Sequence, residues 1–369
     1  MFQLNVKSGL LHVYCCFDVA NLIELDNIKK ILNKQPEESP IQLDKLSPTY
    51  MQYKEPPLLL QLGKKTILLG EIEVSAFVSA KIFSFGTVSI VFRIPVKGSM
   101  ASLKKLAVEF GSSKAKFASE AKNYVKRLTD DMTPALVKPN PEQPNDVFSI
   151  FQVKEFDEKV SAQDFAKKNP DDVAVLLSFE APDLSDRALL EVLRNSFSYY
   201  KTDFIACYSN SVFLIDETDA FDVLDVLEYG FIQAVELRMF DSRLDRELDG
   251  AYDDVEQSNK AGFFYNYEAV RNEVAQLRLD TSEVVEKVEN ALKLVGDAYL
   301  AKVYSLTSAS LHLQEWKTSI QEKLNSLEHV YEVLDDKAQA KRDLKFWVLL
   351  TVLEVVVIIL IAFEVFFPR

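Results

Sequence analysis

The stretch KIFSFGTVSIVFRI (81–94) decides the fold of the N-terminal half of this chain. Its two halves, KIFSFG and TVSIVFRI, are rich in β-branched and aromatic residues, which favour strands. Gly86 lies between them, where a hairpin or a bulge needs a residue with little steric restriction. We therefore predict two adjacent strands that meet at Gly86.

Working outward from this stretch, further strand-like runs cover residues 9–17, 58–62 and 72–78. Apolar residues at helical spacing predict helices at 22–32 and 102–110. The resulting order, β-α-β-β-α, is that of a ferredoxin-like unit, in which helices cover one face of an open sheet. We expect a first α+β unit of this kind.

A second unit is predicted beyond a proline-rich stretch. The sequence TPALVKPNPEQPN (133–145) carries four prolines, which is typical of a linker. After it the order β-α-β-β returns, so the predicted fold class is α+β with one or two ferredoxin-like units. Its elements are a strand at 172–179, a helix at 187–199, strands at 203–209 and 211–216, and a helix from 219 to about 248.

A helical stalk is predicted from about residue 280, because apolar residues recur there every seven positions. Such a period predicts helices that supercoil around one another, but lysines such as Lys323 and Lys337 at intermediate positions weaken a pure dimeric coil. Two arrangements stay open, namely pairing between chains and an antiparallel hairpin on the chain's own helices at 219–248 and 265–278. The heptad includes Leu306, Leu313, Ile320, Leu327 and Leu334.

The last apolar stretch, FWVLLTVLEVVVIILIAFEVFF (346–367), is long enough to cross a membrane. As a helix it spans about 33 Å. Two glutamates interrupt it, and Glu354, Val357, Ile361 and Glu364 follow a 3-4-3 spacing that places them on one face. The carboxyl groups could join the anchors of several chains into a homo-oligomer. Alternatively, Glu354 is protonated and Glu364 reaches the membrane interface.

Charges around this stretch predict the orientation of the chain. Lys337, Lys341, Arg342 and Lys345 precede the apolar segment, and Arg369 alone follows it. The positive-inside rule therefore places the body on the cytoplasmic side of a membrane. The first residues lack the basic region of a secretory signal, so we expect a single-pass protein anchored by its C-terminal helix in the lipid bilayer.

Composition and motifs argue against several classes of function. The 369 residues carry a net charge of −14, which disfavours nucleic-acid binding. The sequence contains no CxxC, HExxH or GxSxG motif and no phosphate-binding glycine loop, so we expect neither an enzyme nor a bound cofactor or metal. Three cysteines are too few for a disulfide framework. Cys15, Cys16 and Cys207 lie in apolar strand-like runs, so we expect buried small hydrophobic residues rather than catalytic ones. The alternative for the adjacent pair Cys15 and Cys16 is that one of them is exposed.

Three stretches resemble one known family, the "required for meiotic nuclear division" proteins. They are Leu353–Val365, with a Leu-Glu start and a Glu-aliphatic end, the hairpin Phe83–Phe92, and the helical run Gln233–Asp241. The resemblance implies a membrane-anchored and oligomeric protein.

Together these features predict a non-enzymatic scaffold that presents an α+β body at the cytoplasmic surface of a membrane. One alternative is a membrane-anchored sensor with a small molecule between its two α+β units. Another is an enzyme whose site has no sequence motif. The predicted regions are a first unit at 1–132, a linker at 133–147, a second unit at 148–250, a stalk at 263–345 and an anchor at 346–367.

Overall fold

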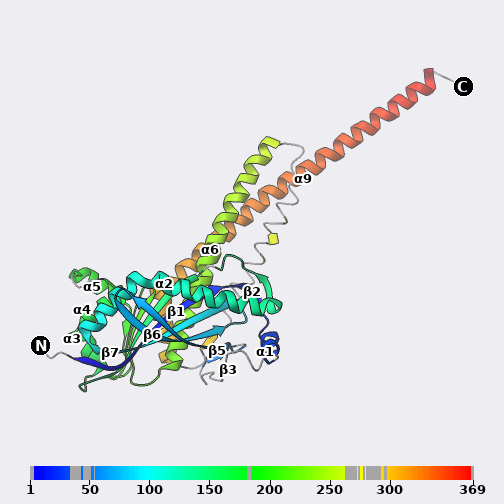
Figure 1. The fold of residues 1–369 in the computed structure, drawn as a ribbon. Helices are drawn as coiled ribbons and strands as arrows, with labels where there is room; N and C mark the ends of the chain where they lie inside the picture. Colours follow the sequence, from blue (N-terminus) through cyan, green and yellow to red (C-terminus); the bar gives the residue numbers. More distant parts are fainter. Residues whose placement is uncertain are drawn as a thin grey trace. The chain divides into compact units, whose positions relative to one another are not determined.

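The computed structural model divides the chain into two units (Figure 1). The first unit comprises Met1–Met239 and Val284–Trp316, and the second comprises Phe240–Glu283 and Lys317–Arg369. The residues that the structure describes are 4–33, 43–44, 51–53, 55–143, 145–180, 184–261, 272, 275–276, 279, 292–294 and 297–366.

One mixed sheet forms the centre of the first unit. Within the described residues it has nine strands in the order β10-β11-β12-β9-β1-β7-β6-β5-β3. Neighbouring strands are antiparallel except β12 and β9, which are parallel. The strands are β1 (Asn5–Asp18), β3 (Leu43–Asp44), β5 (Leu58–Leu69), β6 (Ile72–Ile82), β7 (Thr87–Ser99), β9 (Asn145–Phe156), β10 (Ser196–Phe197), β11 (Phe204–Tyr208) and β12 (Ser211–Ile215).

Strand β1 joins the two halves that the sequence predicts as separate units. It pairs with β7 on one side and with β9 on the other. Residues from both sides of the proline-bearing stretch 133–147 therefore share one sheet, and within this stretch β8 (Leu136–Pro139) pairs with β2 (Ala20–Ile23). The mixed α+β class is confirmed, whereas the finer ferredoxin-like assignment stays a prediction.

Helices cover both faces of the sheet. On one face Phe92 of β7 packs edge-on against Phe117 of α2 (Met100–Met132), with ring centroids 5.3 Å apart. On the other face Phe231 of α6 (Phe221–Ala261) stacks on Phe148 of β9 at 4.5 Å. Figure 1 shows α2 crossing the sheet. Three shorter helices, α3 (Ala162–Lys168), α4 (Pro170–Ser178) and α5 (Asp186–Val192), follow β9.

The predicted burial of the three cysteines is confirmed, and the alternative of one exposed member of the pair Cys15 and Cys16 is wrong. Cys15 and Cys16 are both fully buried. Successive residues of a strand point to opposite faces, and here each face packs against helices. The side chains on both faces of β1 are therefore shielded from solvent.

The prediction of a strand at 172–179 is wrong, because most of these residues belong to the helix α4. The helix begins at Pro170, and Asp171 and Asp172 lie in its first turn. Proline at the first helical position and acidic residues in the first turn both favour a helix N-terminus. A short apolar run does not by itself distinguish a buried strand from a buried helix.

Other boundaries differ from the expected ones by several residues. The predicted helix at 22–32 is divided between β2 and α1 (Leu25–Asn33), and α6 continues to Ala261, past its predicted end near residue 248. A second small sheet pairs β13 (Leu292–Leu294) with β4 (Met51–Tyr53).

In the second unit α6 pairs with α9 (Leu313–Phe366). Ser319 Oγ donates a hydrogen bond to Asp241 Oδ1 at 2.6 Å, and Lys323 Nζ lies 2.6 Å from Asp245 Oδ1. Both pairs are separated by 78 residues in the sequence. In parallel helices the contacting residues keep a constant difference in residue number along the pair. In antiparallel helices this difference would change from one contact to the next, and the sum of the two residue numbers would stay constant. The orientation is parallel, not the antiparallel hairpin considered above, because both helices run from the first unit into the second.

The C-terminal part of α9 is apolar and exposed. Among the described residues, α9 is the one helix that is long and apolar enough to cross a membrane by length and composition, and none of its most apolar 18-residue window is buried. Phe346, Leu353 and Phe363 each expose 60–64% of their surface. The predicted C-terminal apolar helix is therefore confirmed, except that Phe367 lies outside the described residues.

Candidate functional site

The four residues predicted to join anchors lie along α9. Glu354, Val357 and Ile361 are exposed on this helix, and the side chain of Glu364 lies outside the described part of the structure. Their spacing places them on one side of the helix. A role in holding several chains together stays a prediction.

The predicted heptad is divided between two helices. Leu306 lies in α8 (Ala298–Ser310), and Leu313 begins α9. Between them His312 has φ +56°, a left-handed conformation that interrupts a helix. The heptad is thus not continuous, and residues 263–271 and 280–291 of the predicted stalk are among those outside the described residues. The described members Leu306, Leu313, Ile320, Leu327 and Leu334 are all buried.

Lys323, which interrupts the apolar seam of α9, is neutralised by α6. Its ammonium lies 2.8 Å from Asp241 Oδ1 and 2.6 Å from Asp245 Oδ1. The Asp241 side chain is only 11% exposed. Complementary carboxylates on the neighbouring helix explain how a lysine occupies a position that the heptad expects to be apolar. This contact lies within one chain.

Beneath α6 lies a layer of buried and half-buried polar side chains that the sequence pattern did not predict. We call it the polar layer. Its members share one face of the sheet or the facing side of α6. They are His12, Tyr14, Cys16 and Asp18 of β1, Lys81 of β6, Thr87, Ser89 and Arg93 of β7, Gln152 of β9, and Asp225, Glu228 and Glu236 of α6.

Lys81 is the cationic centre of the polar layer. Its ammonium contacts Glu228 Oε2 at 2.5 Å and also pairs with Asp225. Burial by itself lowers the pKa of Lys81, but the negative charges of Glu228 and Asp225 outweigh it and raise the pKa. The lysine is therefore charged at neutral pH, and it links β6 to the first turns of α6.

His12 forms a second polar contact, with Gln152. His12 Nε2 lies 2.9 Å from Gln152 Oε1, while Gln152 Nε2 donates to the backbone carbonyl of Thr218 at 3.3 Å. The carbonyl contact fixes the orientation of the amide, so Nε2 of His12 is the donor and Nδ1 carries no proton. Burial lowers the pKa of His12 to about 3, so the ring is neutral in the folded protein.

A third group of the polar layer contains two acidic side chains. Thr87 Oγ1 donates to Glu236 Oε1, and Asn140 Nδ2 donates to Asp18 Oδ2 at 2.7 Å. Burial raises the pKa of Glu236 well above its usual range, and the charge of Asp18 raises it further. Glu236 therefore resists ionisation at its place beneath the β6–β7 hairpin.

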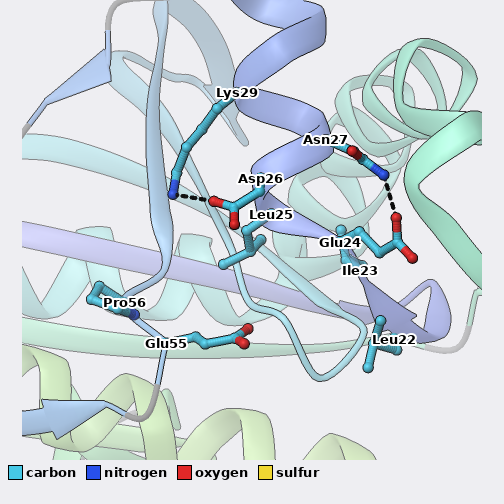
Figure 2. A pocket seen from close by; sticks show the side chains of 9 residues that line it. All are labelled: Leu22, Ile23, Glu24, Leu25, Asp26, Asn27, Lys29, Glu55 and Pro56. Atoms are coloured by element: carbon cyan, nitrogen blue, oxygen red, sulfur yellow. Dashed lines mark hydrogen bonds and ion pairs between the residues drawn. The ribbon is translucent and has the colours of Figure 1, made fainter.

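A charged surface pocket lies at the start of α1 (Figure 2). Its volume is about 430 Å³. Asn27 Nδ2 donates to Glu24, and Lys29 Nζ lies 2.9 Å from Asp26 Oδ1. The hydrogen bond and charge of Lys29 lower the pKa of Asp26. Figure 2 shows Glu55 and Pro56 across the pocket from α1, and the other lining residues are Leu22, Ile23 and Leu25.

A second pocket, of about 630 Å³, lies at the end of β9. Its lining includes Lys154, Glu155 and Asp157, and Asp157 accepts hydrogen bonds from the backbone and side chain of Asn5. Neither pocket is lined by a member of the polar layer. Within the described part of the chain, no three His, Cys, Asp or Glu side chains are grouped to hold a metal ion.

The comparisons with known proteins point to one uncharacterised family. Residues 8–222 match the family model described as "Uncharacterized protein MJ0711, N-terminal domain". The chain is also 23% identical over 205 residues to the uncharacterised protein MJ0711 of Methanocaldococcus jannaschii. This similarity covers 55% of the chain and 62% of that relative's length. No solved structure matches the chain.

This result overturns the resemblance to the meiotic nuclear division family. Two of the three stretches that carried it, 233–241 and 353–365, lie outside the matched residues 8–222. Short runs of Leu, Val and Ile with an occasional glutamate recur in unrelated apolar helices because lipid or core packing selects the same few residues. The matched residues cover more than half of the sequence, and the chain belongs to the family of the MJ0711 N-terminal domain.

Proposed function

We propose that this protein is a membrane-tethered interaction protein that carries its α+β body on a helical stalk. The observation behind the proposal is the exposed apolar part of α9, residues 346–363. Fourteen Leu, Ile, Val and Phe residues in this range each favour insertion by about 0.3–0.6 kcal/mol, and together they outweigh the roughly 3 kcal/mol cost of one central ionisable residue, Glu354.

The body faces the cytoplasm in this proposal. Lys337, Lys341, Arg342 and Lys345 lie on the body's side of the apolar segment. Positive charges are retained on the cytoplasmic side of a membrane-spanning helix. The lipid bilayer is then one partner, and homo-oligomers through the anchor stay part of the proposal.

An aromatic surface cluster supports a protein partner for the body. Tyr199 and Tyr200 expose 52% and 66% of their surface. The ring of Tyr199 lies 4.8 Å from that of Tyr200 and 5.6 Å from that of Tyr299. Tyrosine is enriched at protein interfaces because it combines a large apolar area with a polar tip.

Membrane fractionation of the full chain tests the tether. We expect the protein to stay with membranes at high salt and alkaline pH, and a variant that ends after Lys345 to become soluble. The matched control Glu354→Leu should stay in the membrane, since it removes only the costly charge. Extraction of the unchanged protein by alkali would contradict the proposal.

Purification in detergent distinguishes the interaction role from its alternatives. We expect a specific protein to be retained by the unchanged chain and lost from a Tyr199→Ala/Tyr200→Ala variant. Tyr252→Ala, at an exposed tyrosine of the second unit, should retain it. Recovery of a small molecule without a protein would instead favour the ligand sensor.

A further inference from the structure

We propose that the aromatic surface cluster of Tyr199, Tyr200 and Tyr299 binds an arginine side chain in an exposed segment of a partner protein. The inference rests on the proposed interaction role and adds the chemistry of the partner. It is carried by a fixed row of aromatic rings and a group of carboxylates that lie together in the first unit.

The two exposed tyrosines are held in a fixed arrangement by Asp203. Tyr199 and Tyr200 lie between β10 and β11. The backbone N–H of Tyr199 donates to Asp203 Oδ1 at 2.7 Å, and that of Tyr200 donates to Oδ2 at 2.9 Å. Asp203 is buried. Because both backbone groups are tied to one buried carboxylate, the rings are positioned before a partner binds, which lowers the entropy cost of binding.

The aromatic rings continue as a row that already contacts one cation. The ring of Phe197 lies 6.3 Å from that of Tyr199, and Lys302 Nζ lies 5.7 Å from the centroid of the Phe197 ring. Within the described part of the chain, no lysine or arginine lies over the ring of Tyr199 or Tyr200. The exposed end of the row therefore offers ring faces that attract a further cation.

Three carboxylates lie near the half-buried member of the cluster, Tyr299. Burial raises the pKa of Tyr299, and the charges of Asp203, Asp216 and Asp297 raise it further. Each carboxylate accepts a hydrogen bond from a backbone N–H group. Among the described residues, however, none of the three forms an ion pair with a lysine, arginine or histidine. The cluster therefore adjoins negative charge that no side chain of this part of the structure neutralises.

A fourth carboxylate adds to this charge. Burial raises the pKa of Asp222, and the charges of Asp225 and Asp297 raise it further. Asp225 is paired with Lys81, whereas Asp222 forms no ion pair within the residues that the structure describes. A bound cation would relieve this repulsion between like charges, so charge complementarity favours a basic partner.

The hydroxyl of Tyr299 is also left without a partner. It is shielded from solvent and forms no hydrogen bond with any described residue. Buried polar atoms are nearly always hydrogen-bonded. The Tyr299 side chain as a whole is partly exposed, so the unmatched oxygen lies close to the surface that a partner would cover.

Arginine fits this combination of rings and carboxylates better than lysine does. Its guanidinium is planar and weakly hydrated, stacks on aromatic rings and presents paired donors to a carboxylate. The ammonium of lysine is a strongly hydrated point charge. A cation over an exposed aromatic ring gains about 0.5–1 kcal/mol, which corresponds to roughly two- to fivefold in affinity.

Peptide binding to the full chain in a non-ionic detergent tests the contact. The probe is a fluorescent peptide of alternating arginine and glycine. Matched peptides carry lysine, or citrulline, which keeps the planar shape of arginine without its charge. Fluorescence anisotropy at physiological salt measures the three affinities. We expect the arginine peptide to bind about fivefold more tightly than the lysine peptide and the citrulline peptide not to bind.

Two variants of the rings test the stacking. Tyr199→Ala/Tyr200→Ala should abolish the preference for arginine over lysine, because the ring faces are removed. Tyr199→Phe/Tyr200→Phe keeps the rings and should retain the preference. Tyr252→Ala, at an exposed tyrosine of the second unit, should also retain it.

A second pair of variants tests the charges without altering the rings. Asp216→Asn/Asp297→Asn keeps the side-chain oxygens that accept hydrogen bonds, and it should weaken binding of both basic peptides about fivefold. The matched control is Asp130→Asn/Asp131→Asn, at two exposed positions of α2. This control changes the net charge equally and should bind both peptides as the unchanged protein does.

The outcomes separate the arginine contact from the interaction role. Equal affinity for the arginine and lysine peptides, or a preference that survives in the alanine variant, would overturn the contact. Equal weakening in the α2 control would also overturn it, because net charge alone would then be responsible. Displacement of the arginine peptide by an equal concentration of spermine would show that a free polyamine fills the site, which rules out the protein segment. A protein partner that is still lost from the alanine variant would in each case leave the interaction role intact.

Discussion

Lys81 of β6 and Glu228 of α6 form an ion pair inside the first unit, with Nζ and Oε2 2.5 Å apart. The side chains are 15% and 2% exposed. Asp225 contacts the same ammonium, so one lysine balances two carboxylates from consecutive turns of α6. This contact connects the sheet to the helix that continues into the second unit.

Replacing Lys81 with methionine should destabilise the body by about 3–5 kcal/mol, because it leaves two carboxylates buried without their cation. Urea unfolding of the full chain in detergent measures the loss. Lys65→Met is the matched control, since Lys65 pairs with Glu120 at 2.9 Å in a more exposed position and should cost less than about 1 kcal/mol. Similar losses for the two variants would contradict a structural role of the Lys81 contacts.

His12 should make the protein less stable in acid. Its pKa falls from 6.5 in the unfolded chain to about 3 in the folded protein. Between these values the unfolded state binds one more proton, so the free energy of unfolding decreases by up to about 1.4 kcal/mol for each pH unit lost. His12→Gln should remove this slope between pH 6.5 and 3.

The difference between variant and unchanged protein isolates the effect of His12. Glu236 acts in the opposite direction, because its raised pKa reduces stability as pH rises above about 4.5. The matched control is His329→Gln, whose side chain is 79% exposed, and it should leave the pH dependence unchanged. If the free energy of unfolding still decreased with the same pH slope in the His12 variant, the prediction would be wrong.

Local elements of the fold could be predicted from the sequence, and long-range pairing could not. The strands at 81–94 appear as the end of β6 and most of β7, because β-branched residues around Gly86 carry the signal locally. The run at 172–179 forms a helix, since six apolar residues in eight positions show too little periodicity to distinguish a strand from a helix. That β1 pairs with β9 as well as β7 depends on residues some 140 positions apart, and no local pattern contains this information.

Only the part of the polar layer that lies on β1 could have been predicted from the sequence. His12, Tyr14, Cys16 and Asp18 alternate along β1, and this period of two could have indicated a polar face. Their partners, such as Gln152 and Glu228, come from distant elements. The same alternation would fit a solvent-exposed face, and this face is buried because α6 covers it.

Gly86 is expected to tolerate no side chain. It has φ +104°, and a Cβ there would lie 1.7 Å from the carbonyl oxygen of Ala20. Gly86→Ala should therefore destabilise the protein by more than the roughly 1–2 kcal/mol of left-handed backbone strain alone. Gly63→Ala is the matched control, because Gly63 has φ +92° with no atom within 4 Å of the added Cβ. If Gly86→Ala and Gly63→Ala shifted the unfolding midpoint equally, the backbone at Ala20 would have moved away from the added Cβ at little cost, and the prediction would be wrong.

Lys323 should stabilise the contact between α6 and α9 through Asp241 and Asp245. Lys323→Asp places a third carboxylate beside Asp241 and Asp245, so we expect a loss of about 1–3 kcal/mol. Asp241→Lys in the same chain should restore part of it, and a double-mutant cycle on thermal unfolding gives the coupling energy. A coupling energy near zero would contradict the contact between Lys323 and Asp241.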